Sequence, residues 1–554
     1  MSLPSSKITP LHLLILAAVC LLAITPFFWR GSPSGHDFEF HMYSWMEVLG
    51  QWKQGIVYPR WAALAHWGYG EARFLFYPPA SWALGAALGA LLPWKIVPGA
   101  YCWLVLTLSG VSMYSLARRW LPARDALFAA VLYAVNPYHL VIVYWRSAFA
   151  ELLAAVLLPL LLLALLKITE PGWRPAIRLG MILAAAWLVN APASVMIHYS
   201  VAGLALASAI LGRSWRPIWN TSLAILLGAG LASFYLIPTI HETGWVNINE
   251  VLAPGLRPQD NFLFTSIPEP EHDRFNLLVS TVAAVEIGFL VLVIWSSRRT
   301  RTAAGSPWPL LLCWGALAAL LMIPIANPLW QLLPKLRFVQ LPWRWLLCLN
   351  AAMVLLLTMA TRRWTSRVFA TAVLLGTVLV AGYRIQAPWW DNAADIKEMS
   401  DAVADGVGYE GTDEYVPAGA DPYELNKDQA HVTDAAGRAV PDRTLAWSAK
   451  KAHLLVQSTR PEVLTLRLFN YPAWEVTLNG NRVETQSSEI TQEMMIPVTA
   501  GRNEIQIHFG RTLDRTLGGT ISLLTFGILL GTWIIGSNRR DRLESKACTT
   551  DVTR

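Results

Sequence analysis

The chain has 554 residues, of which 54% are hydrophobic and only 15% are charged. This balance excludes an ordinary soluble globular protein and favours one that crosses a membrane many times. The formal net charge is +7, but Lys and Arg occur in short clusters between apolar runs, which is a pattern of membrane topology and not of a nucleic-acid-binding surface.

The first apolar run, residues 11–28, is too long for a secretory signal and has no small-residue cleavage site, so we interpret it as a membrane span. Eleven further runs are long enough to cross. They are 98–116, 125–144, 150–166, 178–192, 194–211, 219–238, 276–295, 308–325, 342–360, 367–383 and 516–536. The sequence therefore predicts a mostly α polytopic bundle of about 12–13 membrane segments, with a transmembrane domain over residues 1–383 and a last span at 516–537.

Basic clusters at Arg118-Arg119, Arg174 to Arg178, Arg213 to Arg216, Arg298 to Arg301, Arg362-Arg363 and Arg539 to Arg542 predict the orientation. All of them face the cytoplasm if the N-terminus does, provided that the short run 80–94 does not cross. That run contains Gly85-x-x-x-Gly89, a close-packing spacing, and we interpret it as re-entrant or interfacial. A true crossing remains the alternative.

This topology places four connecting segments on the outer face, with the polar region 384–515, and makes the tail 538–554 cytoplasmic. The segments are 29–79, 136–151, 239–275 and 326–341. Residues 384–444 are acidic and predict loops. From 445 to 512, alternating runs such as VLTLRLF, WEVTLNG and NEIQIHF, with Asn479-Gly480 as a turn, predict a small antiparallel β-sandwich-like domain outside the membrane.

The first outer loop, 29–97, contains the most candidate functional residues. From Asp37 to about Gly55, apolar residues recur at helical spacing, which predicts an amphipathic helix lying in the membrane interface. Its polar face carries Glu39, Ser44, Glu47 and Gln51. Asp37 is either the N-cap of this helix or a general base, and the two roles are compatible.

A second possibility for this loop is a divalent cation such as Mg or Mn. Asp37, Glu39 and His41 alternate, and they could share a metal if the backbone there is extended. Other groups on the outer side are candidates for binding a phosphate or substrate, although Arg60 and Arg344 could equally anchor in the interface and His241 could cap a helix. These candidates are Arg60, Arg146, Arg344, His41, Tyr58 and His241.

The order of one span, an aromatic outer loop with an early Asp, then YPRW, GYG and FLFYPP, resembles a bacterial membrane family known as 6-pyruvoyl-tetrahydropterin synthase-related. NPYHLVIVYWRSAFAE, LRFVQLPWRW and FNYPAWEVTLNGNRVE also resemble motifs of that family, which is similar to the GT-C glycosyltransferases. We find no histidine cluster of the kind that a soluble zinc enzyme needs.

The resemblance implies a catalytic carboxylate early in the first outer loop, matched by Asp37 with Glu39 as second choice. It implies a further acidic residue after the second outer turn, where Glu151 is the match. This chain departs from the pattern in having HDFE in place of an adjacent acidic pair. Glu151 also opens a helix, where a carboxylate favours the macrodipole.

The expected function is therefore an enzyme of the bacterial cytoplasmic membrane. It would transfer a sugar from a polyprenyl-phosphate-linked donor to an extracytoplasmic acceptor, namely a cell-envelope glycan, lipid or protein. Its partners would be the bilayer, the donor and the acceptor, with no nucleic acid. Two alternatives remain open, a non-catalytic envelope-assembly scaffold and a transporter of lipid-linked saccharides, although the latter predicts internal repeats and charges in mid-span.

Overall fold

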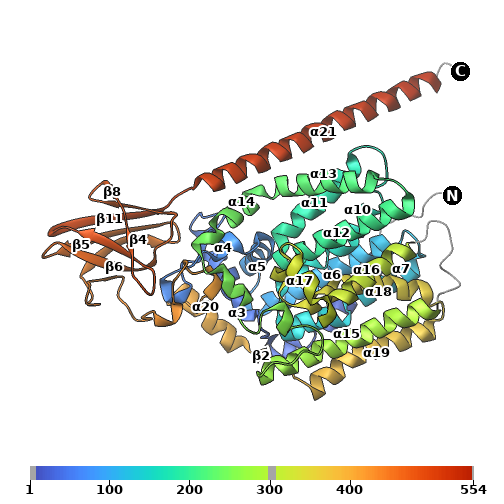
Figure 1. Cartoon of the computed structure of the whole chain (residues 1–554), viewed down its shortest axis with the longest axis horizontal. Coiled ribbons are helices and arrows are strands. Elements are labelled where there is room, and N and C mark those ends of the chain that lie inside the picture. The colour runs from blue at the N-terminus through green and yellow to red at the C-terminus, as the bar shows by residue number, and fades with distance from the viewer. Residues whose placement is uncertain (1–7, 297–306, 552–554) are drawn as a thin grey trace.

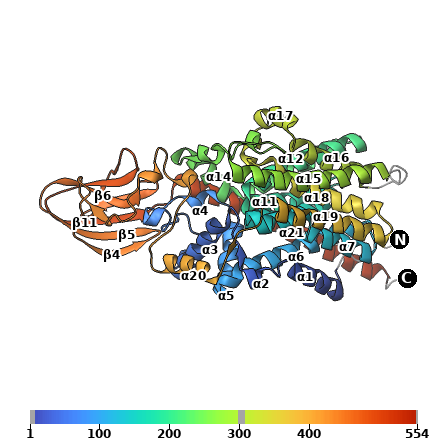
Figure 2. The same ribbon diagram turned by 90° about the horizontal axis from the view of Figure 1, so that it is seen from below.

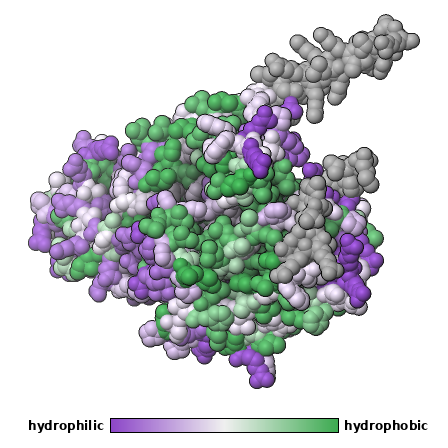
Figure 3. All heavy atoms as spheres, turned by 45° about the vertical axis from the view of Figure 1, so that its right-hand side comes forward, coloured by the Kyte–Doolittle hydropathy of each residue, from purple (hydrophilic) through white to green (hydrophobic). Residues whose placement is uncertain are grey.

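The computed structural model describes residues 8–296 and 307–551, with side chains placed as far as residue 532. A helical body occupies most of the molecule, and two β-sheets project from one end of it (Figure 1). Helix α1 begins, and α21 ends, at the other end of the body (Figure 2). On the face that Figure 3 shows, hydrophobic side chains cover the middle of the helical body, and hydrophilic ones gather on the β-sheets and at the margins of the body. The expected fold class, a polytopic α protein with C-terminal antiparallel sheets, is confirmed.

Most helices of eight or more residues follow the apolar runs of the sequence. They are α1 (Pro10–Ala23), α3 (Phe38–Lys53), α5 (Pro79–Leu91), α6 (Val97–Ala117), α7 (Ala123–Ala134), α10 (Leu157–Leu165), α11 (Arg174–Val189), α12 (Ala191–Gly212), α13 (Arg216–Leu231), α14 (Ser233–His241), α15 (Pro270–Ser296), α16 (Trp308–Leu321), α18 (Leu346–Ala360), α19 (Trp364–Arg384), α20 (Ala393–Ala404) and α21 (Leu513–Asp551). Shorter helices include α2 (Phe27–Arg30), α4 (Arg73–Phe76), α8 (Pro137–Val141), α9 (Phe149–Ala154) and α17 (Asn327–Leu332).

Eight helical segments in the described chain are long and apolar enough to cross a membrane, and two bent pairs raise the number to ten. The bent pairs are α13 with α14, at 79°, and α16 with the helices that follow it, at 91°. The expected runs 150–166 and 178–192 form shorter helices, of which α11 has 16 residues and reaches about 24 Å at 1.5 Å per residue. The basic cluster Arg298 to Arg301 lies outside the described residues, as do the side chains of the tail.

Helix α5, the run of uncertain crossing, has 13 residues and is too short to span a hydrocarbon core of about 30 Å. It packs closely on α3, because a Cβ on Gly85 would come within 2.1 Å of the Trp45 ring. A Cβ on Gly89 would meet the Trp94 ring at 2.3 Å. The two glycines of this Gly-x-x-x-Gly motif therefore leave room for the indole rings of Trp45 and Trp94.

Helix α3 forms where the sequence predicts it, but most of its predicted polar face is buried within the protein. Ser44, Glu47 and Gln51 are all buried, each at most 3% exposed. They face the chain between Trp61 and Arg73 and the distant Tyr409, which supply hydrogen bonds to this polar stripe. Each of these three side chains has a hydrogen-bond partner there, as burial of a polar stripe requires, and only Gln51 Oε1 among their polar atoms has none in the described chain.

The β-domain consists of a four-stranded sheet in the order β3-β6-β10-β9 and a five-stranded sheet in the order β4-β5-β11-β7-β8, both antiparallel. The strands are β3 (Val432–Thr433), β4 (Asp442–Ser448), β5 (Lys451–Ser458), β6 (Glu462–Phe469), β7 (Trp474–Leu478), β8 (Asn481–Val483), β9 (Gln486–Ser487), β10 (Glu493–Val498) and β11 (Gly501–Phe509). Asn479 and Gly480 both have positive φ and close the β7–β8 hairpin, as predicted. The region 384–444 is less loop-rich than expected, since it contains α20.

Two of the contacts between the loops at this end of the body and the β-domain with its linker come from far apart in the chain. Strand β1 (Ser32–Pro33) pairs with β2 (Trp390–Asp391), which ties the first outer loop to the chain after α19. The carboxylate of Glu242, at the end of α14, is fully buried and accepts hydrogen bonds from Arg515 at 2.7 and 2.8 Å and from the Tyr471 hydroxyl at 2.7 Å. One carboxylate lies within a candidate membrane span, because Glu286 is buried in α15, beside Asn350.

Candidate active site

Asp37 is positioned by backbone pairing between the first outer loop and the end of the third span. The Asp37 N–H donates to the Arg146 carbonyl at 2.9 Å, and the Gly35 N–H donates to the Ser147 hydroxyl at 3.0 Å. Only glycine fits at position 35, because a Cβ there would lie 2.3 Å from the Trp145 carbonyl oxygen. The loop therefore lies directly on the chain that carries Arg146.

The Asp37 side chain occupies the N-cap position of α3 but makes no capping hydrogen bond within the described chain. Its carboxylate is 36% exposed, and one oxygen lies 3.5 Å from Nη2 of Arg146. Asp37 is thus at the N-cap position, as one alternative predicted, but its side chain does not donate or accept the hydrogen bond of a helix cap among the described residues. A carboxylate that is rigidly placed, partly exposed and without a capping hydrogen bond is accessible to an incoming hydroxyl group.

Arg146 and Arg344 meet on one buried carboxylate, that of Glu151. Arg146 ends a π-helical turn, Ile142–Arg146, and its Nη1 forms an ion pair with Glu151 Oε2. Arg344 Nε reaches the same oxygen at 3.1 Å, and the Tyr138 hydroxyl donates to Oε1 at 2.5 Å. The Arg146 guanidinium also lies 4.8 Å from the centre of the Trp343 ring. We call Arg146, Glu151 and Arg344 the charged centre.

The geometry disfavours the expected catalytic role of Glu151. This side chain is 2% exposed and both of its oxygens already have partners. It holds two guanidinium groups from distant parts of the chain, and buried charges of this kind require such pairing. Arg146 Nε is buried and has no hydrogen-bond partner among the described residues, so the charged centre retains a donor for an added anion.

A cavity of about 520 Å³ opens beside Asp37. It is lined by Ser34, Gly35, His36, Phe38, Glu39, Trp389, Trp390 and Asp391. Burial, together with the negative charge of Asp391 and Glu410, raises the pKa of Glu39. Burial and the nearby charge of Asp395 raise the pKa of Asp391. Glu39 thus lines a cavity rather than joining the charged centre.

The predicted metal trio is not assembled. A shared metal site required an extended backbone at these positions, but α3 begins at Phe38. On a helix, alternate residues point in different directions, and this separates Asp37, Glu39 and His41. His41 is 1% exposed, among the rings of Trp45, Tyr77 and Phe149. Burial lowers the pKa of His41 to about 4. In the described chain, no group of three or more His, Cys, Asp or Glu side chains is placed to hold a metal ion.

Three of the expected phosphate-binding residues lie elsewhere. The Arg60 guanidinium stacks on the Tyr58 ring at 4.7 Å, and its electrostatic neighbours are Glu242, Asp514 and Arg515. His241 is exposed at the end of α14, beside Trp245. These residues belong to the junction of α14, α21 and the β-domain, because the chain turns away from Asp37 after α3.

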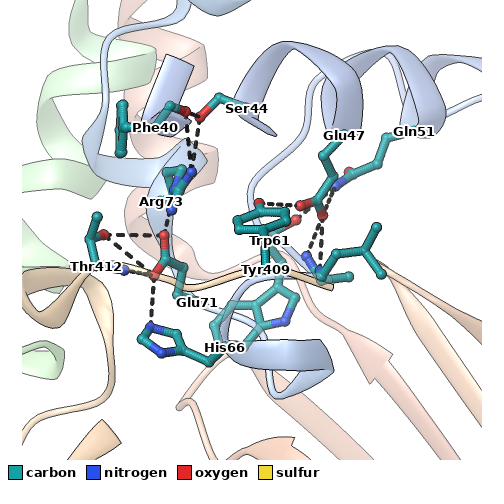
Figure 4. Close-up of polar contacts among 12 residues, drawn as sticks. Phe40, Ser44, Glu47, Gln51, Trp61, His66, Glu71, Arg73, Tyr409 and Thr412 are labelled. Atoms are coloured by element: carbon teal, nitrogen blue, oxygen red, sulfur yellow. Dashed lines mark hydrogen bonds and ion pairs between the residues drawn. The ribbon is translucent and has the colours of Figure 1, made fainter. Parts of the chain in front are cut away.

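A buried polar network that the sequence did not single out joins α3 to the linker before the β-domain (Figure 4). The Glu71 carboxylate meets His66 Nε2 at 3.0 Å, the Thr412 N–H at 2.8 Å and the Arg73 guanidinium. Burial would raise the pKa of Glu71, but Arg73 and His66 outweigh it and lower that pKa to about 2. In the sequence, the only indication of this ion pair is the segment GYGEARF, in which Glu71 and Arg73 lie among apolar residues.

The second half of this network centres on Glu47. Its carboxylate accepts hydrogen bonds from the Tyr409 hydroxyl at 2.5 Å, from the N–H groups of Ala63 and Leu64, and from the Gln51 amide at 3.1 Å. Burial raises the pKa of Glu47 to about 7, although the Tyr409 hydrogen bond and Arg73 oppose the rise. Glu47 and Glu71 thereby attach the linker to the loop that carries the candidate site.

Comparisons with known proteins give one family and a set of distant solved structures. The model of the 6-pyruvoyl-tetrahydropterin synthase related domain, a membrane protein family, matches residues 74–388. That range includes the charged centre. It does not include the cavity, because the lining residues 34–39 precede the range and 389–391 follow it. No curated protein matches the sequence.

Among solved structures, the arabinofuranosyltransferase AftD from Mycobacteria aligns with 69% of this chain at 18% identity and a TM-score of 0.39. The chain spans only 27% of that protein's length. ArnT from Cupriavidus metallidurans, solved bound to undecaprenyl phosphate, aligns over 71% of this chain and 69% of its own, at 14% identity and a TM-score of 0.45. An Archaeoglobus fulgidus oligosaccharyltransferase complexed with Zn and sulfate aligns over 72% of this chain and 53% of its own, at 14% identity and a TM-score of 0.37.

Proposed function

We propose that this chain, which belongs to the membrane protein family of the 6-pyruvoyl-tetrahydropterin synthase related domain, is a glycosyltransferase that uses a polyprenyl-phosphate-linked sugar donor. It would act at the outer side of a bacterial cytoplasmic membrane and transfer the sugar to an extracytoplasmic acceptor. The donor class follows from the sequence resemblance to GT-C enzymes.

One observation carries the proposal. The half-exposed carboxylate of Asp37 lies 3.5 Å from Arg146, whose guanidinium is anchored by Glu151 and so coupled to Arg344. A proton acceptor therefore stands next to a buried pair of cations. A general base for the acceptor hydroxyl and cations for the departing phosphate both contribute to transfer of a sugar from a phosphate.

In the proposed reaction, an acceptor hydroxyl attacks the anomeric carbon of the donor sugar. The new C–O bond forms as the bond from that carbon to the phosphate oxygen breaks, and both electrons of the broken bond leave with the polyprenyl phosphate. Asp37 takes the hydroxyl proton. Arg146 and Arg344 stabilise the negative charge that develops on the departing phosphate.

The other residues position these groups. Glu151 holds the two guanidinium groups in fixed orientation, and Gly35 allows the close approach that puts Asp37 against Arg146. The proposed reaction does not use a divalent cation such as Mg or Mn, because Asp37 and Glu39 do not converge and Asp37 already faces Arg146.

The test is sugar transfer or sugar release by purified protein from a panel of polyprenyl-phosphate sugars, with and without Mg²⁺ or Mn²⁺. Asp37→Asn is expected to lower turnover by about 10²–10⁴-fold while donor binding persists. Asp401→Asn, an exposed carboxylate on α20, serves as the matched control and should leave turnover unchanged.

Two outcomes contradict the proposal in different ways. If wild-type protein neither turns over nor binds any donor of the panel, the enzymatic function is wrong, and a scaffold or transport role stands in its place. If Asp37→Asn keeps full activity, the function stands but the base is another group.

A further inference from the structure

The cavity beside Asp37 has a chemical character that the proposed transfer reaction does not by itself explain. Its two walls come from residues 34–39 and 389–391, about 350 positions apart in the sequence, and the β1–β2 pairing holds them together. Its volume of about 520 Å³ falls within the range of small-molecule sites. His36 and Phe38, the neighbours of Asp37 in the chain, both line it.

The cavity is negatively charged and its lining contains no basic side chain except the imidazole of His36. Glu39 and Asp391 line it, and their electrostatic neighbours Glu410 and Asp395 are also acidic. Lys397, on the neighbouring helix α20, is already paired with Asp401. Two carboxylates without a cation between them favour a ligand that brings positive charge and disfavour a phosphate or a uronate.

The aromatic rings point to the same kind of ligand. Trp389 and Trp390 form the second wall, and the His36 ring lies 5.8 Å from that of Trp389. The Trp390 ring already accepts one cation, because the Arg30 guanidinium lies 5.6 Å from its centre. Indole faces attract ammonium groups and also stack on the apolar face of a sugar ring.

We propose that this cavity binds the ammonium group of an acceptor that carries both an amine and hydroxyl groups, with the ammonium between Glu39 and Asp391 and an indole beside it. An amino sugar or the ethanolamine headgroup of a lipid has this chemistry. The assignment of the ligand as the acceptor rests on the proposed function, since the cavity is lined by His36 and Phe38, the residues on either side of the proposed base, Asp37. Binding itself does not depend on it.

The experiment measures binding by calorimetry and tryptophan fluorescence, using full-length protein in phosphatidylglycerol nanodiscs at about pH 6.5, where amines are protonated. The probes are glucosamine, glucose and N-acetylglucosamine, which differ only at one substituent. Glucosamine is expected to bind at least about 10-fold more tightly than the other two, and added salt should weaken its binding.

Variants identify the site. Glu39→Gln and Asp391→Asn should each weaken glucosamine binding by about 10-fold or more, since each removes one of the two charges. Glu475→Gln, an exposed carboxylate on β7 of the β-domain, should bind glucosamine like wild type. Equal binding of glucose and glucosamine, or unchanged glucosamine binding in both cavity variants, would overturn the inference.

A further arm separates the two sources of the amine. Nanodiscs that contain phosphatidylethanolamine compete with glucosamine if the natural ligand is a lipid headgroup, and do not compete if it is a soluble amino sugar. The result is also distinguishable from failure of the proposed function. Protein that binds glucosamine but never releases sugar from a donor retains this site and loses the transfer reaction.

Discussion

Asp37 and Arg146 are joined twice, once by backbone and once by side chain. The Asp37 N–H donates to the Arg146 carbonyl at 2.9 Å, and the Asp37 carboxylate lies 3.5 Å from the Arg146 guanidinium. The proposed proton acceptor and the proposed phosphate ligand therefore move together. Their spacing is a property of the backbone and does not depend on two flexible side chains finding each other.

The first prediction follows from this double contact. Gly35→Ala places a Cβ 2.3 Å from the Trp145 carbonyl oxygen, so the paired segments must separate and Asp37 must shift. We expect turnover to fall by about 100-fold although no charged group is changed. Gly244→Ala, where a Cβ meets no atom within 4 Å, is the control. Wild-type turnover in Gly35→Ala would show that the backbone pairing does not set the site.

The second prediction concerns Glu151. Glu151→Gln removes the anion that Arg146 and Arg344 share, which leaves Arg344 without its ion pair and Arg146 with only the partly exposed Asp37. We expect the free energy of unfolding to drop by about 3–5 kcal/mol and the KM for the donor to rise. Glu170→Gln, an exposed residue, should change neither quantity. A variant as stable as wild type would mean that the charged centre is held in another way.

The third prediction tests the contact between α3 and α5. Gly85→Ala would push a methyl group into the Trp45 ring at 2.1 Å, whereas Gly50→Ala, on α3, meets no atom within 4 Å. Thermal unfolding in detergent should therefore show a lower Tm for Gly85→Ala, because overpacking costs about 1–3 kcal/mol. Gly50→Ala should be neutral or stabilising, since alanine favours a helix by about 1 kcal/mol over glycine. The reverse order would contradict this packing.

The fourth prediction is a pH dependence centred on Glu47. Burial raises the pKa of Glu47 from its ordinary 4.5 to about 7, so the folded protein retains a proton that the unfolded chain releases. The stability that this proton contributes is complete below pH 4.5 and is lost as the pH rises to about 7. The loss amounts to about 3 kcal/mol by the time the pH has passed 7.

Glu47→Gln is the test, because the amide keeps a hydrogen on one atom at every pH. The Tm of the variant minus that of wild type should increase between pH 4.5 and about 7 and then level off. Glu475→Gln provides the exposed control, with a Tm difference that stays constant. A Tm difference for Glu47→Gln that does not vary with pH would show that Glu47 is ionised throughout.

The fifth prediction concerns orientation. A reporter fused after Arg119 should be cytoplasmic, and one inserted at the exposed turn around Gly437 should be extracytoplasmic. The 13-residue length of α5 is the reason, since a helix of that size does not cross. An external signal after Arg119 would make α5 a true span and would invert every assignment that follows it.

Local sequence pattern predicted most of the fold. Apolar run length located the long helices, alternation located β6, β7 and β11, and Asn479-Gly480 located the hairpin. Each of these signals depends on residues within one element, so neighbouring positions carry the information. The same pattern also predicted helix α3 and the residues of its polar face, but periodicity does not reveal what a polar stripe will face.

The choice among carboxylates was made only by tertiary structure. Asp37, Glu39, Glu47 and Glu151 all lie in outer segments and look alike in sequence, yet one faces Arg146, one lines a cavity and two are buried hubs. Their partners are far away in the chain, with 193 residues between Glu151 and Arg344 and 362 between Glu47 and Tyr409. The sequence by itself determined which residues carry charge at this end of the molecule. Which of those charges remains free for chemistry depends on burial and pairing, and these exist only once distant segments have packed together.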